Sequence, residues 1–137
     1  MKNLFLLLSL FITSYSFSQE DRHSIDIENG KCLENAVPTT IGSIKCEQAA
    51  LASWKTELDT ILKQLKADPT LINIKLLEET QAKWLAFHKS DVKFYESYYR
   101  IQYQGGTMAR AAAVSYEKRH LRERVLYLLE FYEELRE

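Results

Sequence analysis

Apolar residues recur every seven positions along three long segments of this chain, and that spacing restricts the fold to packed helices. The first helix is expected from about residue 41 to 66, where the recurring residues are Ile44, Leu51, Leu58 and Leu65, joined by Trp54 and Ile61. Thr39 and Thr40 offer N-cap hydroxyl groups in front of it. Pro69 ends it, because proline has no N–H to donate and restricts the residue before it.

The second helix is expected from about Thr70 to Tyr103 and carries two apolar stripes. One stripe follows steps of three and four: Leu77, Gln81, Trp84, His88, Val92, Tyr95 and Tyr99. The other, interrupted by Asp91, consists of Phe87, Phe94, Tyr98 and Ile101. Two apolar faces predict a helix that lies between two neighbours. The amide of Gln81, inside the first stripe, is expected to find backbone carbonyl partners.

A third helix is expected from about Thr107 to Leu135, after Gly105 and Gly106 end the second one with left-handed caps. Its seven-residue stripe is Val114, Leu121, Leu128 and Leu135. Short connections make sequential helices antiparallel neighbours, so the sequence predicts an all-α fold, a three-helix up-down-up bundle. An additional stripe on the third helix is either a dimer face or part of a wide core face, and the oligomeric state stays open; its residues are Leu126 and Leu129.

The N-terminus has the pattern of an export signal. Lys2 precedes an apolar run over residues 4–12, and the small residues Ser16 and Ser18 follow. This pattern predicts a signal peptide over residues 1–18, cleaved after about Ser18. The apolar run does not end in a cysteine, which argues against a lipoprotein anchor. No later segment approaches the ~20 apolar residues of a membrane span, so no membrane anchor is expected after cleavage.

Residues 19–137 are then expected to form one helical domain in the periplasm or outside the cell. The first part of this domain, residues 19–38, is expected to be irregular, because it is polar and contains an Asn-Gly turn signal. An even number of cysteines in an exported chain favours a disulfide between Cys32 and Cys46. Closing a loop of roughly 15 residues would stabilise the fold by about 3 kcal/mol and tie the irregular segment to the first helix.

Composition and spacing argue against several classes of function. Of the 18 Lys and Arg residues, 17 lie beyond the signal peptide, against 19 Asp and Glu, so no basic surface for nucleic acid is expected. His23 alone beside the cysteines does not complete a zinc site, and His88 and His120 are far apart, with His88 expected half-buried on a helix face. Adjacent Glu78 and Glu79 point in different directions on a helix, and no triad or phosphate-binding loop is present in the sequence. The sequence predicts no enzyme, no metal and no cofactor.

Two clusters are candidates for binding a partner. Tyrosines gather before the Gly-Gly break, and tyrosine is common at interfaces because its ring is apolar and its hydroxyl polar. Core packing is expected for Tyr95 and Tyr99, whereas Tyr103 is left open between core and interface. The run of mixed charge over residues 117–124 predicts an exposed helix face with salt bridges; the alternative is a binding surface for an anionic envelope component.

Taken in order, these residues resemble the LprI-like lysozyme-inhibitor N-terminal domain family over about residues 30–130. The resemblance rests on two cysteines with threonines between them, a Gln-x-x-Trp-x-x-aromatic motif, a Gly-Gly loop, and an arginine and a leucine in the last helix. In this chain these residues are Cys32, Thr39, Thr40, Cys46, Gln81, Trp84, Phe87, Gly105, Gly106, Arg124 and Leu128. The second cysteine pair of the family is replaced by Val92 and about Tyr116, and the arginine after its aromatic residue by His88.

The resemblance implies an exported helical domain that binds lysozyme and inhibits it by occluding its cleft, with no chemistry of its own. From exposure and tyrosine content, the expected contact residues are Tyr103, Gln104 and Thr107, beside Gly105 and Gly106. The alternative is an envelope domain that binds another protein or a peptidoglycan-related partner.

Overall fold

The computed structural model describes residues 23–137 and is all-α, as predicted. Its helices are α1 (Ser24–Asn35), α2 (Thr40–Leu65), α3 (Ile74–Gln102) and α4 (Gly106–Glu134), and this part of the chain contains no strand. The predicted number of three helices is therefore wrong. The predicted signal peptide, its cleavage after Ser18 and residues 19–22 lie outside the described residues.

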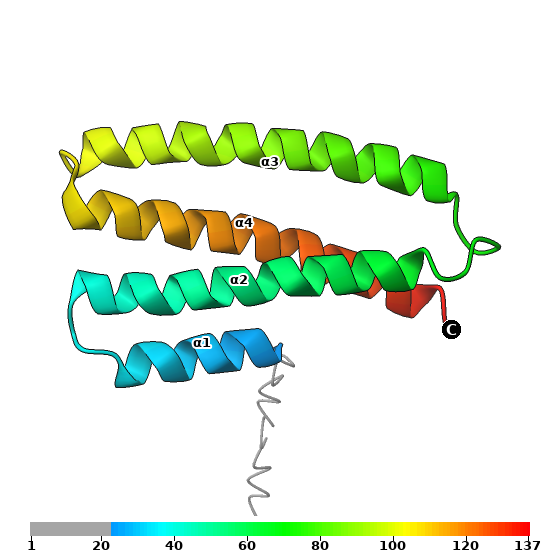
Figure 1. The fold of residues 1–137 in the computed structure, drawn as a ribbon, viewed down its shortest axis with the longest axis horizontal. Helices are drawn as coiled ribbons and strands as arrows, with labels where there is room; N and C mark the ends of the chain where they lie inside the picture. The colour runs from blue at the N-terminus through cyan, green and yellow to red at the C-terminus, as the bar shows by residue number, and fades with distance from the viewer. Residues whose placement is uncertain (1–22) are drawn as a thin grey trace, which may run out of the picture.

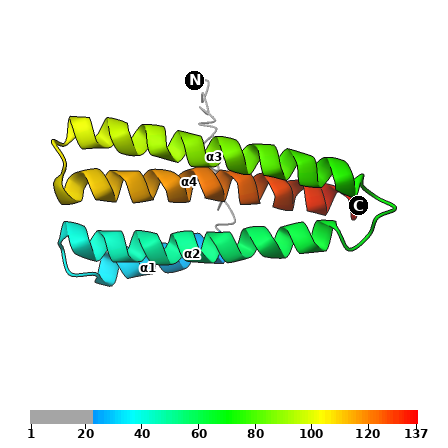
Figure 2. The same cartoon turned by 45° about the horizontal axis from the view of Figure 1, so that its top comes forward.

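The helices lie side by side in the order α3, α4, α2, α1 (Figure 1). Helices α2, α3 and α4 alternate in direction, as an up-down-up bundle requires. Among the described helices, however, α2 and α3 do not pack on each other, because α4 lies between them and packs on both (Figure 2). Helix α1 packs against α2. The connection over residues 66–73 spans the width of α4 and places α3 on its far side (Figure 2). Although this connection is short, it does not make α2 and α3 neighbours.

The core lies between α2 and α4. Every apolar residue that the seven-residue spacing marked in α2 is buried, and Trp54, Ile61 and Val125 have no exposed surface at all. The buried residues of these two helices that form the core cluster are Ala50, Leu51, Trp54, Leu58, Ile61, Leu65, Leu121, Val125 and Leu128. Leu126 and Leu129 are half-buried against the same cluster and belong to a wide core face.

Helix α1 occupies the segment that was expected to be irregular, so this part of the prediction is wrong. His23 caps the helix by accepting the N–H of Ile25 at 3.3 Å, and Ile25 is the one buried residue of α1. The Asn-Gly pair that indicated a turn lies inside the helix, at Asn29 and Gly30. With a single buried residue the segment shows no apolar stripe, which is why the sequence pattern did not reveal it.

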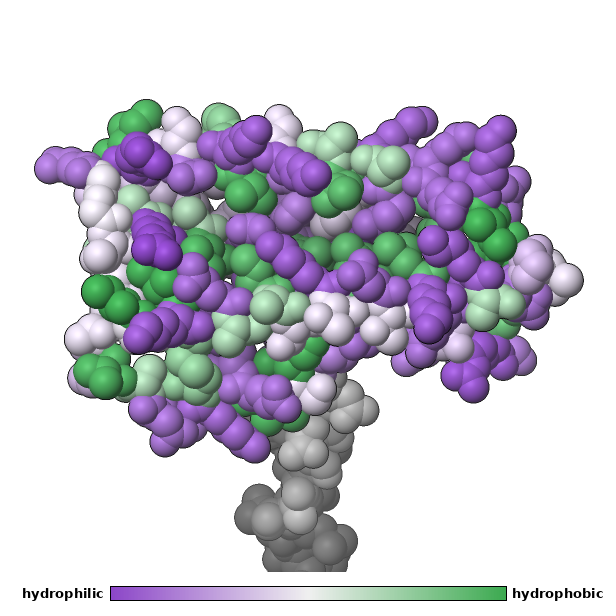
Figure 3. All heavy atoms as spheres, in the orientation of Figure 1, coloured by the Kyte–Doolittle hydropathy of each residue, from purple (hydrophilic) through white to green (hydrophobic). Residues whose placement is uncertain are grey.

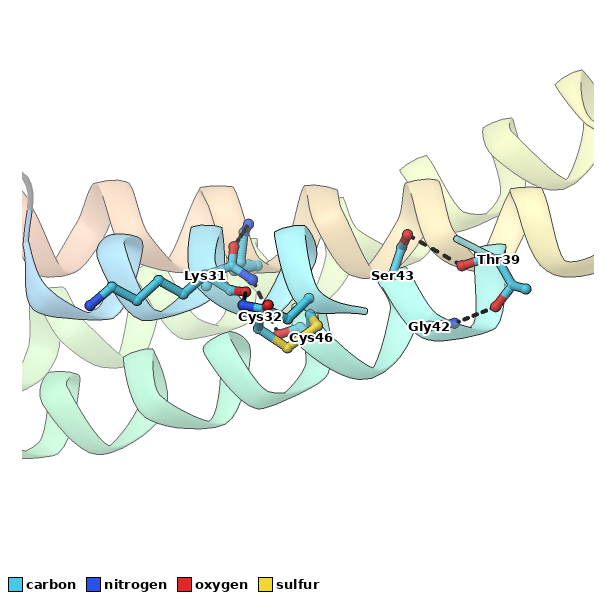
Figure 4. Close-up of a disulfide and its surroundings, with 9 residues drawn as sticks. Lys31, Cys32, Thr39, Gly42, Ser43 and Cys46 are labelled. Carbon is cyan, nitrogen blue, oxygen red and sulfur yellow. Dashed lines mark hydrogen bonds between the residues drawn. A yellow bond between two sulfur atoms is a disulfide. The ribbon is translucent and has the colours of Figure 1, made fainter. Parts of the chain in front are cut away.

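Contacts with distant residues hold α1 in place. The predicted disulfide joins Cys32 of α1 to Cys46 of α2, with 5.7 Å between the Cα atoms (Figure 4). Arg122 of α4 donates to both carboxylate oxygens of Asp26 at 2.7 to 2.9 Å. Asn29 donates to the carbonyl of Cys46 at 3.3 Å. A covalent bond, an ion pair and a buried apolar side chain thus replace the apolar stripe that the other helices use.

The start of α2 follows the sequence closely. Thr39 accepts the N–H of Gly42 at 3.1 Å through its hydroxyl group, as an N-cap should, and its carbonyl accepts the hydroxyl of Ser43 (Figure 4). A Cβ on Gly42 would lie 2.4 Å from the carbonyl oxygen of Val37, so this position requires glycine. Helix α3 begins later than expected, because Asn73 rather than Thr70 caps it by accepting the N–H of Leu76 at 3.1 Å.

Helix α3 has one helical neighbour in the described structure, and the expectation of two is wrong. The first stripe of the sequence faces α4. The second stripe is exposed to solvent: Phe87 by 57%, Phe94 by 63% and Ile101 by 73%. This exposure follows from the position of α4, which keeps α2 away from α3.

We expect the Cys32→Ser, Cys46→Ser double variant to keep α2, α3 and α4 folded and to lose order in α1. Opening a loop of this length should lower the free energy of unfolding by about 3 kcal/mol. Hydrogen exchange resolved along the chain measures the loss at residues 24–35, and denaturant unfolding measures the free energy. A reducing agent should reproduce the effect in the wild type and leave the double variant unchanged. Cooperative unfolding of the whole domain on reduction would contradict this division.

Candidate functional site

The turn between α3 and α4 is shaped by three successive left-handed residues. Gln104, Gly105 and Gly106 have φ angles of 52°, 80° and 77°, and Gly105 donates its N–H to the carbonyl of Arg100 at 2.8 Å. Helix α3 ends just before the two glycines, as predicted, but the left-handed residue that follows its last turn is Gln104 rather than a glycine. Gly105 and Gly106 instead begin α4, as its N-cap and first residue, with positive φ angles that would strain a Cβ. The result is a narrow turn at one end of the molecule (Figure 1). The side chains of Tyr103 and Gln104 in this turn are exposed.

A cleft of about 520 Å³ adjoins this turn. Its floor consists of small apolar side chains of α4, and its rim carries charges. The residues that line it are Val92, Glu96, Arg100, Gly105, Gly106, Ala109, Arg110, Ala113, Val114 and Glu117. Arg100 pairs with Glu96 at 3.2 Å on the exposed rim, and Arg110 is exposed on α4. Two guanidinium groups therefore stand beside the turn.

Exposed apolar side chains surround the same end of the molecule. The connection between α1 and α2 lies at this end (Figures 1 and 2), and Thr40 donates its hydroxyl to the sulfur of Met108 at 3.7 Å. Three apolar side chains are exposed here: Met108 by 52%, Ile41 by 57% and Val37 by 69%. Figure 3 shows hydrophobic atoms at this end as well as along the line of α4. This patch could not be predicted from the sequence, because its members come from two distant segments, residues 37–41 and Met108.

The structure brings the predicted contact residues together at this end. Tyr103 caps α3 and is 46% exposed, Gln104 follows it in the turn, and Thr107 lies in the exposed first turn of α4. Their role in binding a partner remains a prediction.

The motif residues Gln81, Trp84 and Arg124 meet at the contact between α3 and α4. Arg124 donates to the side-chain oxygen of Gln81 at 3.1 and 3.0 Å and lies 5.6 Å from the centre of the Trp84 ring. Gln81 thus accepts from a side chain of α4, and the expected backbone partners were wrong. Burial lowers the pKa of Arg124. Phe87, the third residue of the motif, is exposed and touches the ring of His120 edge-on.

Two histidines that are 32 residues apart meet at the same contact. The Nδ1 atoms of His88 and His120 are 3.1 Å apart, and Trp84 stacks on His88 with ring centres 4.8 Å apart. His88 is only 5% exposed, so the expectation that it is half-buried understated its burial. Asp91 lies 3.6 Å from Nδ1 of His120 and accepts the hydroxyl of Tyr116. No local sequence signal indicates this cluster, because it depends on the register between α3 and α4.

Tyrosines extend this contact toward the turn. Tyr95 of α3 stacks on Tyr116 of α4 with ring centres 3.9 Å apart, and Tyr99 continues the row. Tyr95 and Tyr99 are half-buried, which agrees with their expected packing role, and Tyr98 is exposed. Burial and the hydrogen bond to Asp91 raise the pKa of Tyr116 well above its usual range.

The run of mixed charge over residues 117–124 is less exposed than expected. Its salt bridges exist, but they join α4 to other helices. Glu117 pairs with Lys55 of α2 at 3.1 Å, and Lys118 pairs with Glu47 of α2 at 2.7 Å. Lys118 also donates to Asn29 of α1 at 2.8 Å. The run therefore fixes the positions of the neighbouring helices.

The described residues contain no group of three or more His, Cys, Asp or Glu side chains placed to hold a metal ion. In the same part of the chain, no helix combines the length and the apolar character that crossing a membrane requires.

Comparison with known proteins gives one match. A family model described as lysozyme inhibitor LprI matches residues 32–128, which include the disulfide, the contact between α3 and α4, and the turn. No curated protein and no solved structure matches the chain.

Replacing Gln81 by Leu should lower the free energy of unfolding by about 1–2 kcal/mol, because the half-buried guanidinium group of Arg124 loses its acceptor. Denaturant unfolding measures the change. Gln48→Leu, the same substitution at an exposed position of α2, is the matched control and should have little effect. Equal losses in the two variants would show that the hydrogen bond contributes nothing.

Proposed function

Because the chain belongs to the LprI family of lysozyme inhibitors, we propose that it binds lysozyme and blocks hydrolysis without forming a covalent bond. The protein would act outside the cytoplasm, in the periplasm or after secretion. The Cys32–Cys46 disulfide supports this location, since disulfides persist in oxidising compartments.

The observation that carries the proposal is the exposed turn between α3 and α4. Lysozyme cleaves a glycosidic bond with two carboxyl groups that face each other in a cleft. A narrow turn fits such a cleft, and the side-chain amide of Gln104 offers it hydrogen-bond donors. Arg110 lies beside the turn and adds a cationic group that complements carboxylates, whereas Arg100 lies there as well but already pairs with Glu96. Tyr103 adds an aromatic ring of the kind that dominates binding energy in protein interfaces.

The apolar residues around the turn also favour binding of lysozyme at this end of the molecule. Binding energy concentrates in a few central residues when the surrounding contacts exclude water. Val37, Ile41 and Met108 are exposed beside the turn and are suited to that surrounding role. The face that meets lysozyme would then be the whole end of the molecule rather than the turn alone.

The direct test uses the chain without residues 1–18, titrated into lysozymes of several types while the lysis of cell walls is recorded. We expect lysis by at least one type to fall with increasing inhibitor and to recover when the inhibitor is diluted, because the complex is non-covalent. Unchanged lysis for every type at a large excess would refute the proposal. The alternative drawn from the sequence, another protein or a peptidoglycan-related partner, would then take its place.

The turn itself is tested by Tyr103→Ala. We expect inhibition to weaken by roughly tenfold or more, the effect of removing a central aromatic contact. Tyr127→Ala is the matched control, because Tyr127 is an exposed tyrosine of α4 that lies outside the residues around the turn. Circular dichroism checks that both variants keep their helices. If the two variants inhibit equally well, the turn is not the contact surface.

A further inference from the structure

Helix α3 is attached to the molecule in a different way from α2. Helix α2 buries a row of apolar side chains, whereas His88 is the one buried residue among the 29 residues of α3. Among the described helices, α3 packs on α4 alone. The contact between α3 and α4 therefore centres on the imidazole ring of His88, and histidine is the side chain that ordinarily gains its charge near physiological pH.

The hydrogen bond between the two histidines restricts where their protons lie. A single hydrogen bond between the Nδ1 atoms, 3.1 Å apart, requires one ring to donate and the other to accept in its neutral form. Asp91, 3.6 Å from Nδ1 of His120, favours His120 as the donor. If both rings are protonated, two N–H groups and two positive charges face each other inside the contact, and the hydrogen bond is lost.

We propose that the His88–His120 pair is a pH-sensitive latch, and that α3 separates from α4 when both rings are protonated. The inference concerns the fold and holds whether or not the chain inhibits lysozyme.

The groups around His88 oppose its protonation on balance. Burial and the neighbouring His120 are the main causes that lower the pKa of His88 from its ordinary value of 6.5, and Lys55 of α2 adds to them. Glu117 of α4 and Asp91 act in the other direction, but Glu117 is paired with Lys55 at 3.1 Å. A lowered pKa means that the neutral ring stabilises the closed state above pH 6.5. This stabilisation is lost as the pH falls from 6.5 toward the lower pKa of the closed state.

The connections at the two ends of α3 permit the movement. Residues 66–73 join α3 to α2, and residues 103–105, which include the left-handed Gln104 and Gly105, join it to α4. The core between α2 and α4 contains no histidine, so the same protonation leaves it intact. Opening is therefore expected to be local to α3.

Hydrogen exchange of the mature chain, resolved by peptide and expressed as protection factors, tests the latch between about pH 7.5 and about pH 5. Uptake of one proton on opening lowers protection by up to tenfold for each pH unit below the ordinary pKa. We expect this fall in residues 74–102 and a constant protection in α2. His88→Gln, which keeps a hydrogen-bonding side chain but does not titrate, should remove the pH dependence. His23→Gln, which removes a histidine outside the contact, should keep it.

Three results would overturn the latch: protection of α3 that does not change with pH, an equal fall in all helices, or an unchanged pH dependence in His88→Gln. If His88→Gln fails to fold at neutral pH by circular dichroism, His88→Asn, a second substitution that cannot take up a proton, provides the same test. In that variant a fall in α3 protection as large as in the wild type would also refute the proposal.

Discussion

The packing of α2 on α4 supports every other contact in the described structure. Trp54, Ile61 and Val125 are completely buried there, and each such side chain contributes about 1.5–3 kcal/mol relative to an exposed one. Helix α3 packs on no other helix than α4. Helix α1 packs on α2 and reaches α4 through charged and polar side chains. Helix α4 is thus the one element that contacts all the others, although it comes last in the chain.

The two sides of α4 use different chemistry. Toward α2 it presents aliphatic side chains, whose packing does not depend on pH, flanked by the ion pairs of Glu117 with Lys55 and of Lys118 with Glu47. Toward α3 it presents Tyr116, His120 and Arg124, which meet hydrogen-bonding and aromatic partners. A polar contact of this kind is specific in register, because each donor must find its acceptor, but it loses stability when one partner changes charge. Helix α4 therefore holds α2 mainly through apolar packing and holds α3 through polar contacts that weaken when a histidine is protonated.

Regular spacing made the helices α2, α3 and α4 predictable from the sequence. Local chemistry predicted the cap of α2 at Thr39 and the break at Gly105 and Gly106, but not the ends of α3 at Asn73 and Gln104. Helix α1 was not, because it is held by a disulfide and by Arg122, 96 residues from its partner Asp26. The exposure of the second stripe on α3 could not be predicted from the sequence either, because periodicity shows that a face is apolar but not whether another helix covers it. The disulfide and the turn were found from residue types alone. The histidine pair and the apolar end of the molecule required the register between helices.

The position of α4 has a consequence for the order in which the chain can fold. A chain that is exported from its N-terminus presents α1 and α2 first to the oxidising compartment, and the cysteines that join them are only 14 residues apart. That hairpin can close its covalent bond there from local encounters. Helix α3 then follows with no helix available to receive it, because the surface on which it packs belongs to a segment that emerges later. Until α4 arrives, the aromatic residues of α3 are exposed, and exposed apolar surface on an incomplete chain favours association with its neighbours.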